Sequence, residues 1–152
     1  YTVCMYSNRL LAGMPVPITA SSITLPLLDC AVHRGITPST AQDFSGKQLD
    51  ISALLVEHPQ STCLLRVAGP SMQEYGMVDG DLIVVDRAIQ ARHGHIVVAI
   101  VDSEFTVKYL HQADGDTLLK AGNPTCPDIT LKGEHTIEIW GVVTSCIKRF
   151  SK

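Results

Sequence analysis

The sequence predicts an all-β domain, a small rolled sheet or barrel, with an irregular N-terminal arm and one short helix. Short apolar runs recur along most of the chain, and turn-forming residues separate them at intervals of about 8 to 12 residues. Valine, isoleucine and leucine supply most of the apolar side chains, and aromatic residues make up only 5% of the sequence. With 45% hydrophobic and 18% charged residues, the chain is able to bury a core of β-forming side chains.

Residues 1–48 form the predicted arm, which shows little periodicity. Proline and glycine interrupt it repeatedly, at Pro15, Pro17, Pro26, Gly35, Pro38 and Gly46. The chain begins at Tyr1, whereas Met14 opens a segment that resembles a native start, so the sequence leaves open whether residues 1–13 are native. We therefore divide the chain into an arm over residues 1–48 and a folded domain over residues 49–152.

The domain begins with the one predicted helix, over residues 49–55, which ends before His58-Pro59. Strands are then expected at residues 62–67, 82–86, 95–101, 104–110, 117–120, 136–140 and 142–147. The joins between them are turn-forming pairs and triplets, at Asp79-Gly80-Asp81, His93-Gly94, Asp102-Ser103, Asp114-Gly115, Gly122-Asn123-Pro124 and Lys132-Gly133. This order of short strands and tight turns favours one antiparallel sheet that curls on itself.

Charge and composition argue against several classes of function. The formal net charge is −3 and the pI is near 6.0, so the chain lacks the basic surface of a protein that binds DNA directly. Apolar runs are far shorter than the roughly 20 residues that span a bilayer, and the N-terminus does not resemble a signal peptide. We therefore expect a cytoplasmic protein without a membrane anchor.

The cysteine and histidine patterns predict neither a metal site nor a cofactor. The five cysteines are an odd number and none are spaced as Cys-x-x-Cys, so we expect reduced thiols rather than a zinc site or a disulfide framework. His93 and His95 are separated by one residue, but no third ligand lies near them in the sequence. A turn is the better interpretation of this pair.

Two residues have the chemistry of a nucleophile and its base. Ser71 follows a predicted strand in Gly69-Pro70-Ser71-Met72, and a serine hydroxyl becomes nucleophilic when a base removes its proton. Lys108 lies in a predicted strand, on the face opposite the side chains of Phe105, Val107 and Tyr109. An amine surrounded by apolar groups loses hydration, which lowers its pKa and lets it act as a base. Taken alone, the same residues also fit a turn serine and a solvated strand lysine.

The order of four sequence blocks resembles the LexA/UmuD family of self-cleaving serine peptidases. These blocks cover residues 67–72, 76–86, 93–99 and 104–108, within a similarity that extends from about residue 25 to about residue 150. Ser71 and Lys108 are 37 residues apart, as in that family. The resemblance implies that Ser71 is the nucleophile, that Lys108 is its base, and that the backbone N–H groups of Ser71 and Met72 hold the oxyanion.

The resemblance also implies self-cleavage about 35 residues before the nucleophile, where this sequence has Arg34-Gly35. Arg34 departs from the small residue that the family has before the cut, while Gly35 fits because glycine allows close backbone approach. Ala12-Gly13 matches the family dipeptide better but lies further upstream. The cleavage site expected here is therefore Arg34-Gly35, with Ala12-Gly13 and no efficient cleavage as the alternatives.

The segment before the expected cut favours the UmuD branch, because 34 residues rich in Pro, Ser and Thr cannot form a helix-turn-helix domain. This branch implies an SOS-response protein whose cleavage is promoted by RecA on single-stranded DNA. The cleaved form would be a homodimer that serves a Y-family, UmuC-like polymerase in translesion synthesis. Two alternatives remain: a cleavage-deficient module that regulates a polymerase, and a LexA-like repressor fragment without its DNA-binding domain.

Overall fold

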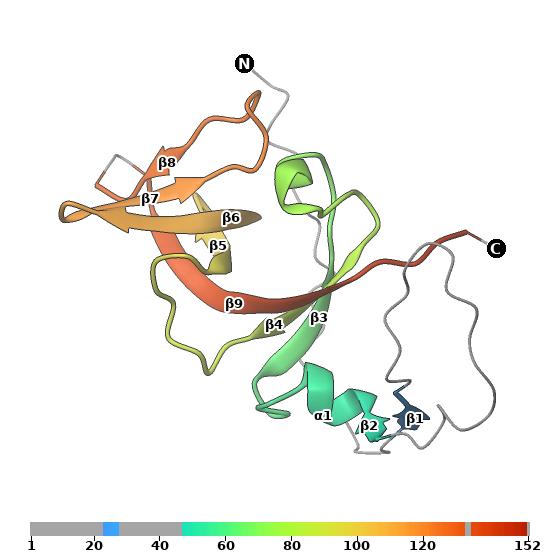
Figure 1. Cartoon of the computed structure of the whole chain (residues 1–152). Helices are drawn as coiled ribbons and strands as arrows, with labels where there is room; N and C mark the ends of the chain where they lie inside the picture. The colour runs from blue at the N-terminus through green and yellow to red at the C-terminus, as the bar shows by residue number, and fades with distance from the viewer. Residues whose placement is uncertain (1–22, 28–46, 133–134, 152) are drawn as a thin grey trace.

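A computed structural model describes residues 23–27, 47–132 and 135–151 (Figure 1). Its main body is a seven-stranded antiparallel sheet in the order β3-β4-β9-β5-β6-β7-β8, and a separate two-stranded sheet joins β1 to β2. The elements are β1 (Thr24–Pro26), β2 (Gln48–Asp50), α1 (Ile51–Leu55), β3 (Thr62–Arg66), the 3-10 turn η2 (Gln73–Tyr75), β4 (Leu82–Asp86), β5 (Ile96–Val101), β6 (Glu104–Ala113), β7 (Asp116–Lys120), β8 (Ile129–Thr130) and β9 (Ile137–Ile147). The all-β prediction with one short helix is confirmed.

The sheet curls because its longest strand, β9, pairs with strands in both halves of the sheet. β9 pairs with β4 through its C-terminal half and with β5 through its N-terminal half, and Figure 1 shows it bending between them. The expected break between residues 140 and 142 was wrong, since β9 is continuous there. The strand instead contains two register shifts, in which Thr144 is the extra residue opposite Val84 and Val85, and Trp140 the extra residue opposite Val98 and Ala99. Such irregularities increase strand bending.

Gly141 explains why this point in the sequence resembled a strand end. A Cβ atom built on Gly141 would lie 2.7 Å from Cγ1 of Val85, so only glycine allows β9 to pass this close to β4. The glycine therefore marks a close approach of two strands rather than a turn.

The hairpins that connect β5, β6 and β7 have the tight turns that the sequence predicted. Asp102 and Ser103 have φ angles of 49° and 70°, and Asp114 and Gly115 have φ angles of 54° and 81°. Positive φ at both central residues is the signature of a type I′ turn, whose twist matches that of a β-hairpin. These turns fix the register that places β6 between β5 and β7.

Two apolar clusters cover the two faces of the central strands. One contains Val67, Met72, Met77, Ile83, Val85, Val98 and Val107, and the other contains Val97, Ala99, Leu110, Leu119 and Val142. Because neighbouring residues of β5 belong to different clusters, and Val107 and Leu110 of β6 do as well, both faces of these strands contribute to the core.

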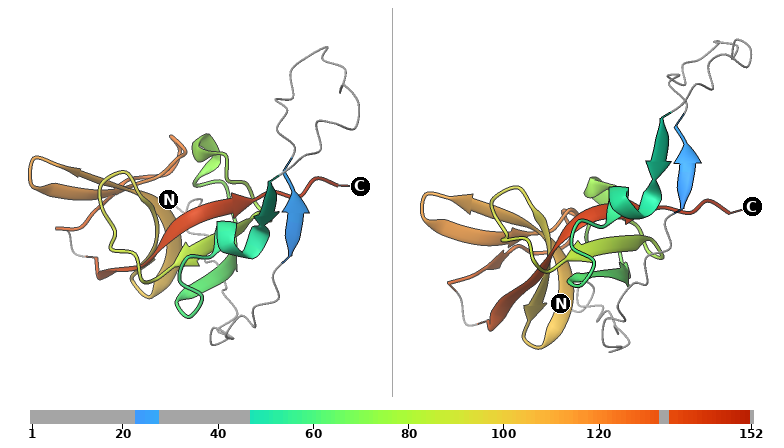
Figure 2. Two further views of the ribbon diagram at one scale, coloured as in Figure 1. Left: turned by 60° about the horizontal axis from the view of Figure 1, so that its bottom comes forward. Right: turned by 90° about the horizontal axis from the view of Figure 1, so that it is seen from below.

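The region around residue 48 is more ordered than the sequence indicated. Residues 24–26 and 48–50 pair as β1 and β2, although no strand was predicted there. The helix starts at Ile51 rather than at residue 49, because the Asp50 carboxylate caps it by accepting hydrogen bonds from the N–H groups of Ser52 and Ala53, at 2.8 and 3.3 Å. Both views in Figure 2 show the β1-β2 ribbon beyond α1, at the end of the molecule opposite the β6-β7 hairpin.

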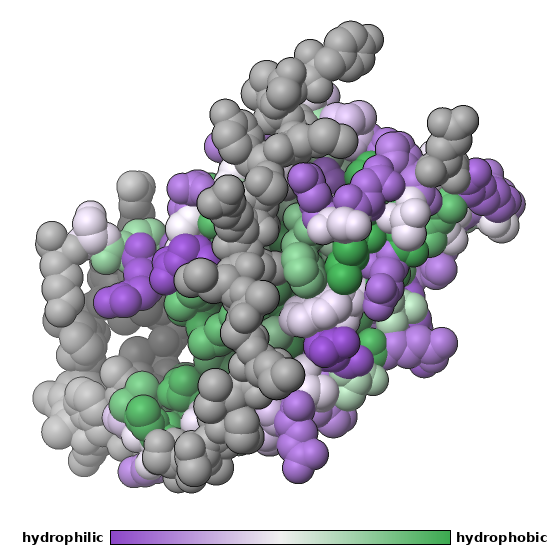
Figure 3. All heavy atoms as spheres, turned by 180° about the vertical axis from the view of Figure 1, so that it is seen from behind, coloured by the Kyte–Doolittle hydropathy of each residue, from purple (hydrophilic) through white to green (hydrophobic). Residues whose placement is uncertain are grey.

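Exposed apolar side chains concentrate at this same end. Ile23, Leu25 and Leu27 beside or within β1 are 60%, 50% and 49% exposed, and Leu54 in α1 is 60% exposed. In Figure 3 apolar atoms are visible at the end of the molecule where β1, β2 and α1 lie. No helix in the described part of the chain is long and apolar enough to cross a membrane.

The cysteines depart in part from the expected reduced state. Cys63 and Cys146 are free thiols, as expected. Cys126 is disulfide-bonded, so the expectation of reduced thiols is wrong for this residue. The described residues contain no group of three or more potential metal ligands.

Candidate active site

Ser71 lies in the loop that joins β3 to η2, and this loop is held at both ends. Gly69 has a φ angle of 83°, a conformation that favours glycine, and its N–H donates to Oδ1 of Asp79 at 3.0 Å. Met72, directly after Ser71, is 1% exposed and belongs to the core cluster around Val98. The serine itself is half-buried, between a backbone turn and a side chain fixed in the core.

A second segment, the turn after β7, contacts the Ser71 loop along its backbone. The N–H of Gly122 donates to the carbonyl oxygen of Ser71 at 2.7 Å, and the N–H of Glu74 donates to the carbonyl oxygen of Gly122 at 2.8 Å. The side-chain amide of Asn123 donates to the carbonyl oxygen of Pro70 at 3.0 Å. These three hydrogen bonds fix the loop to the β7-β8 connection.

Gly122 has to be glycine for this contact to form. A Cβ atom at this position would lie 2.3 Å from Cδ2 of Tyr75 and 3.2 Å from Cα of Met72. The Tyr75 ring stacks on Tyr109 with ring centroids 5.4 Å apart and an interplanar angle of 12°. The tyrosine pair therefore packs η2 onto β6.

Lys108 lies in the middle of β6 and is only 4% exposed. Its register partner on β5 is Val97, and Val107 before it belongs to a core cluster. Within the described part of the chain, no carboxylate oxygen lies within 4.0 Å of its amine. Burial lowers the pKa of Lys108, and the nearby negative charge of Asp128 opposes this effect only in part.

The Gly122 contact places the Ser71 loop beside the end of β7, which pairs with the strand that carries Lys108. Tyr109 pairs with Lys120, and Ala121 follows Lys120 at the point where the chain leaves β7. The next residue, Gly122, is the one whose N–H binds the Ser71 carbonyl. Figure 1 shows η2 beside the ends of β6 and β7, in agreement with the stacking of Tyr75 on Tyr109.

The predicted cleavage residues lie outside the described residues. This holds for Arg34 and Gly35 and for the alternative pair Ala12 and Gly13. Ser71, Met72 and Lys108 lie within the described residues, and their catalytic roles, like the cleaved bond, remain predictions.

A hollow of about 1060 Å³ lies elsewhere, between the β3-β4 connection and the C-terminal segment, and is lined by Arg66, residues 78–82 and residues 147–151. Two of its charged groups pair: Asp81 accepts a hydrogen bond from Lys148 at 2.5 Å, and also one from the N–H of Val78 at 3.0 Å. The hydrogen bond from Lys148 is the main reason why the pKa of Asp81 is lowered. The predicted Asp79-Gly80-Asp81 turn thus has a structural role.

Sequence reasoning missed the residues that join the Ser71 loop to the sheet. Gly122 and Asn123 were identified only as part of a turn, and Tyr75, Tyr109 and Asp128 were given no role near the site. The contacts of these residues depend on which strand lies next to β6, and no local sequence pattern predicts that neighbour. The one available signal was the turn triplet Gly122-Asn123-Pro124 itself.

Comparison with known proteins assigns the fold to a family. A family model described as Peptidase S24-like matches residues 26–144, which is most of the chain. This chain belongs to the S24-like peptidase family. The match covers β3 to β7 and the loop and strand that carry Ser71 and Lys108. The resemblance to LexA and UmuD proteins that the sequence blocks indicated is thereby confirmed.

Individual proteins are also similar in sequence to this chain. The chain is 42% identical to Protein MucA of Salmonella typhimurium over 108 residues, which are 70% of this chain and 73% of that protein. It is 42% identical to Protein SamA of Salmonella typhimurium strain LT2 over 112 residues, 74% and 77% of the two chains. Against the LexA repressor of Paracidovorax citrulli the identity is 34% over 135 residues, which are 89% of this chain and 58% of the repressor.

Proposed function

We propose that this S24-like protein is an autocatalytic serine endopeptidase that cuts its own arm with a Ser71–Lys108 dyad. The neutral amine of Lys108 takes the hydroxyl proton while Oγ of Ser71 attacks the carbonyl carbon of Arg34. The resulting oxyanion accepts hydrogen bonds from the backbone N–H groups of Ser71 and Met72. Lys108 then returns the proton to the amino group of Gly35 as the peptide bond breaks, and water hydrolyses the acyl-enzyme.

The observation that carries this proposal is the burial of Lys108 without an ion pair. A lysine that is 4% exposed and has no carboxylate within 4.0 Å among the described residues gives up hydration that no ion pair replaces. The lowered pKa increases the fraction of neutral amine at any given pH, which suits Lys108 to act as a base.

The backbone around Ser71 supports the same role. Among the described residues, the N–H groups of Ser71 and Met72 donate no backbone hydrogen bond. Donors left unused beside a nucleophile are suited to hold an oxyanion. The Ser71 carbonyl, in contrast, is bound by Gly122, so the loop presents its N–H groups rather than its carbonyl oxygens.

The proposed substrate is the Arg34-Gly35 bond of the same chain, with Ala12-Gly13 as the alternative. A substrate attached to its own enzyme has a high effective concentration, so even a weak dyad cuts it once. Cleavage is favoured at alkaline pH, where a larger fraction of Lys108 is neutral.

For the cellular role we propose the UmuD type. In this proposal RecA on single-stranded DNA promotes cleavage, and the processed homodimer serves a Y-family, UmuC-like polymerase in SOS mutagenesis, in the cytoplasm. Identities of 42% to MucA and SamA over about three quarters of those proteins support this branch. The net charge of −3 agrees with a role that needs no direct DNA binding.

Mass spectrometry of purified protein incubated at alkaline pH tests the peptidase. We expect a new N-terminus at Gly35 in the wild type and none in Ser71→Ala or Lys108→Ala. The control is Lys132→Ala, because Lys132 is 68% exposed and pairs with Asp116 away from the proposed dyad. Cleavage at the wild-type rate in either dyad variant would disprove the assignment.

Adding RecA filaments on single-stranded DNA separates the peptidase from the alternative of a cleavage-deficient polymerase module. The peptidase is expected to be cut faster with filaments than without them. A wild-type chain that stays intact under both conditions favours the module. A native gene that encodes an upstream helix-turn-helix would instead identify a LexA-like repressor fragment.

A further inference from the structure

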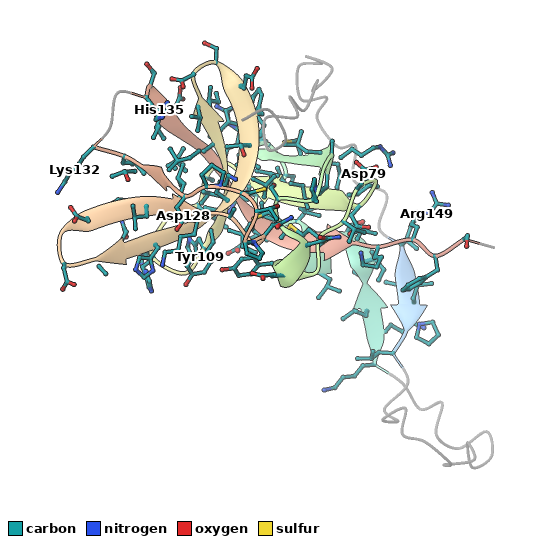
Figure 4. The ribbon with its side chains drawn as sticks, turned by 90° about the horizontal axis from the view of Figure 1, so that it is seen from above. Asp79, Tyr109, Asp128, Lys132, His135 and Arg149 are labelled. Carbon is teal, nitrogen blue, oxygen red and sulfur yellow. The ribbon has the colours of Figure 1, made fainter. Side chains whose placement is uncertain are left out.

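Asp128 is an acidic residue beside the proposed dyad that the mechanism does not use. It precedes β8, and its Oδ1 accepts a hydrogen bond from the N–H of Ala121 at 3.2 Å. The carboxylate is therefore attached to the backbone at the point where the chain leaves β7. Figure 4 shows Asp128 close to Tyr109, in the middle of the molecule and away from Lys132 and Arg149.

The strand register places this carboxylate near Lys108. Lys120 and Tyr109 are the last pair of β7 and β6, and Ala121 follows Lys120 while Lys108 precedes Tyr109. The Asp128 carboxylate that binds the N–H of Ala121 therefore lies at the end of this pairing, beside the part of β6 that carries Lys108. Asp128 also raises the pKa of Tyr75, although burial of that ring and the charges near it contribute more. The charge of Asp128 thus affects the pKa of Tyr75 on η2 as well as that of Lys108 on β6.

Other charged groups on the surrounding elements do not act on Lys108 in the same way. Glu74 lies on η2, and Lys120 lies on β7 opposite Tyr109. The pKa of Lys108 is nevertheless set by burial, which lowers it, and by Asp128, which raises it. Since Val97 and the core residues around Lys108 are apolar, Asp128 is the one described charge that favours the ammonium form.

We propose that Asp128 is a positioning residue that restrains self-cleavage: its carboxylate stabilises the charged form of Lys108 and so reduces the fraction of neutral base. This proposal rests on the proposed Ser71–Lys108 peptidase and adds the control of its base. Asp128 forms no close ion pair with Lys108. Its charge therefore favours the ammonium form without blocking the amine that accepts the serine proton.

The competing interpretation is that Asp128 only shapes the turn through its hydrogen bond to Ala121. Substitution with asparagine separates the two roles, since an asparagine side chain keeps the oxygen acceptor and removes the charge. Asp128→Glu keeps the charge instead. The matched control is Asp116→Asn, because Asp116 is 61% exposed on β7 and pairs with Lys132 away from Lys108.

The experiment is the pH profile of self-cleavage in the full chain, followed by gel and mass spectrometry. We expect the midpoint of the Asp128→Asn profile to move to lower pH, with cleavage on the order of threefold faster or more at pH values below the wild-type midpoint. Asp128→Glu and Asp116→Asn should keep the wild-type midpoint. Added salt should lower the midpoint of the wild type more than that of Asp128→Asn, because salt screens an exposed carboxylate.

An unchanged midpoint in Asp128→Asn would overturn the proposal, whether or not the rate falls. A uniform loss of rate at every pH would assign Asp128 a purely structural role. These outcomes are distinct from failure of the peptidase itself, which would show as cleavage that survives Lys108→Ala or as no cleavage in the wild type at any pH.

Discussion

At the scale of single residues, Lys108 combines a cost in stability with its proposed role as a base. A buried amine without an ion-pair partner gives up hydration that the fold does not replace. The same desolvation lowers the pKa of Lys108 and makes the neutral amine available. Activity and stability therefore place opposite demands on this position.

Lys108→Met tests that conflict. We expect the variant to lose self-cleavage and to gain about 1 kcal/mol in free energy of unfolding, because methionine fills a similar volume without a polar atom. Urea denaturation at neutral pH measures the gain, and the difference from wild type should shrink at alkaline pH as Lys108 becomes neutral. A variant less stable than wild type would show that the amine stabilises the fold.

Gly122 is the second residue where a small change has a large expected effect. In Gly122→Ala the new methyl group meets the Tyr75 ring at 2.3 Å, which displaces η2 and the Ser71 loop. We expect cleavage to slow at least about tenfold, because misplacement of a nucleophile is costly, and stability to fall by about 1 to 3 kcal/mol.

The double variant Gly122→Ala with Tyr75→Ala is the control for this clash. Removing the ring opens the space that the methyl group needs, so the double variant should cleave faster than Gly122→Ala alone. Equal rates in the two variants would show that the Tyr75 contact does not position the loop.

At the scale of elements, a buried acid ties the segment after α1 to β4. Asp86 is 2% exposed and accepts hydrogen bonds from Nδ1 of His58 at 2.6 Å, from Oγ of Ser61 at 3.2 Å and from the N–H of Ala88 at 2.8 Å. Burial alone would raise the pKa of Asp86, but the hydrogen bonds from His58, Ala88 and Ser61 outweigh it and lower the pKa. The pKa of His58 is raised, chiefly by its hydrogen bond to Asp86.

These two directions define a pH window for the pair. The raised pKa of His58 means that its contribution to stability is complete below the ordinary value of 6.5 and is lost as pH rises through the folded value. The lowered pKa of Asp86 means that its contribution is present above the ordinary 3.8 and is lost as pH falls through the folded value. The pair thus stabilises the fold most at mildly acidic pH.

The substitution His58→Gln should make the stability of the fold less dependent on pH. From about pH 5 to about pH 9 we expect the stability advantage of the wild type over His58→Gln to decline, since only the wild type loses a protonated partner of Asp86. Urea denaturation of both proteins across the range measures the difference, and effects of other titrating groups cancel in it. A constant difference would contradict the role of the pair.

The elements also show which parts of the fold can be predicted from the sequence. The β5-β6 and β6-β7 hairpins could be predicted because Asp102-Ser103 and Asp114-Gly115 are local signals for type I′ turns. β9 was predicted as two strands on either side of Gly141, whereas the reason for this glycine, the close approach of Val85, is not local in sequence. The same limit hid Asp128, whose relation to Lys108 depends on which strand lies beside β6.

At the scale of the whole molecule, the central question is whether a chain cuts itself or a neighbour. The S24-like domain holds the proposed dyad on one folded body, while the expected cleavage site belongs to the arm of the same polypeptide. Covalent attachment gives that arm an effective concentration that a separate molecule reaches only at high protein concentration. Cleavage within one chain therefore has a large advantage, unless the arms exchange inside a dimer.

Dilution and mixing distinguish these routes. We expect the first-order rate constant of cleavage to stay the same over about a hundredfold dilution, because an intramolecular reaction does not depend on encounter. Ser71→Ala protein, labelled and mixed with wild type, should remain intact, since it offers an arm but no nucleophile of its own. Cleavage of the labelled chain would instead require the dyad of one protomer to act on the arm of another. A rate constant that falls on dilution would further show that the two protomers meet only transiently.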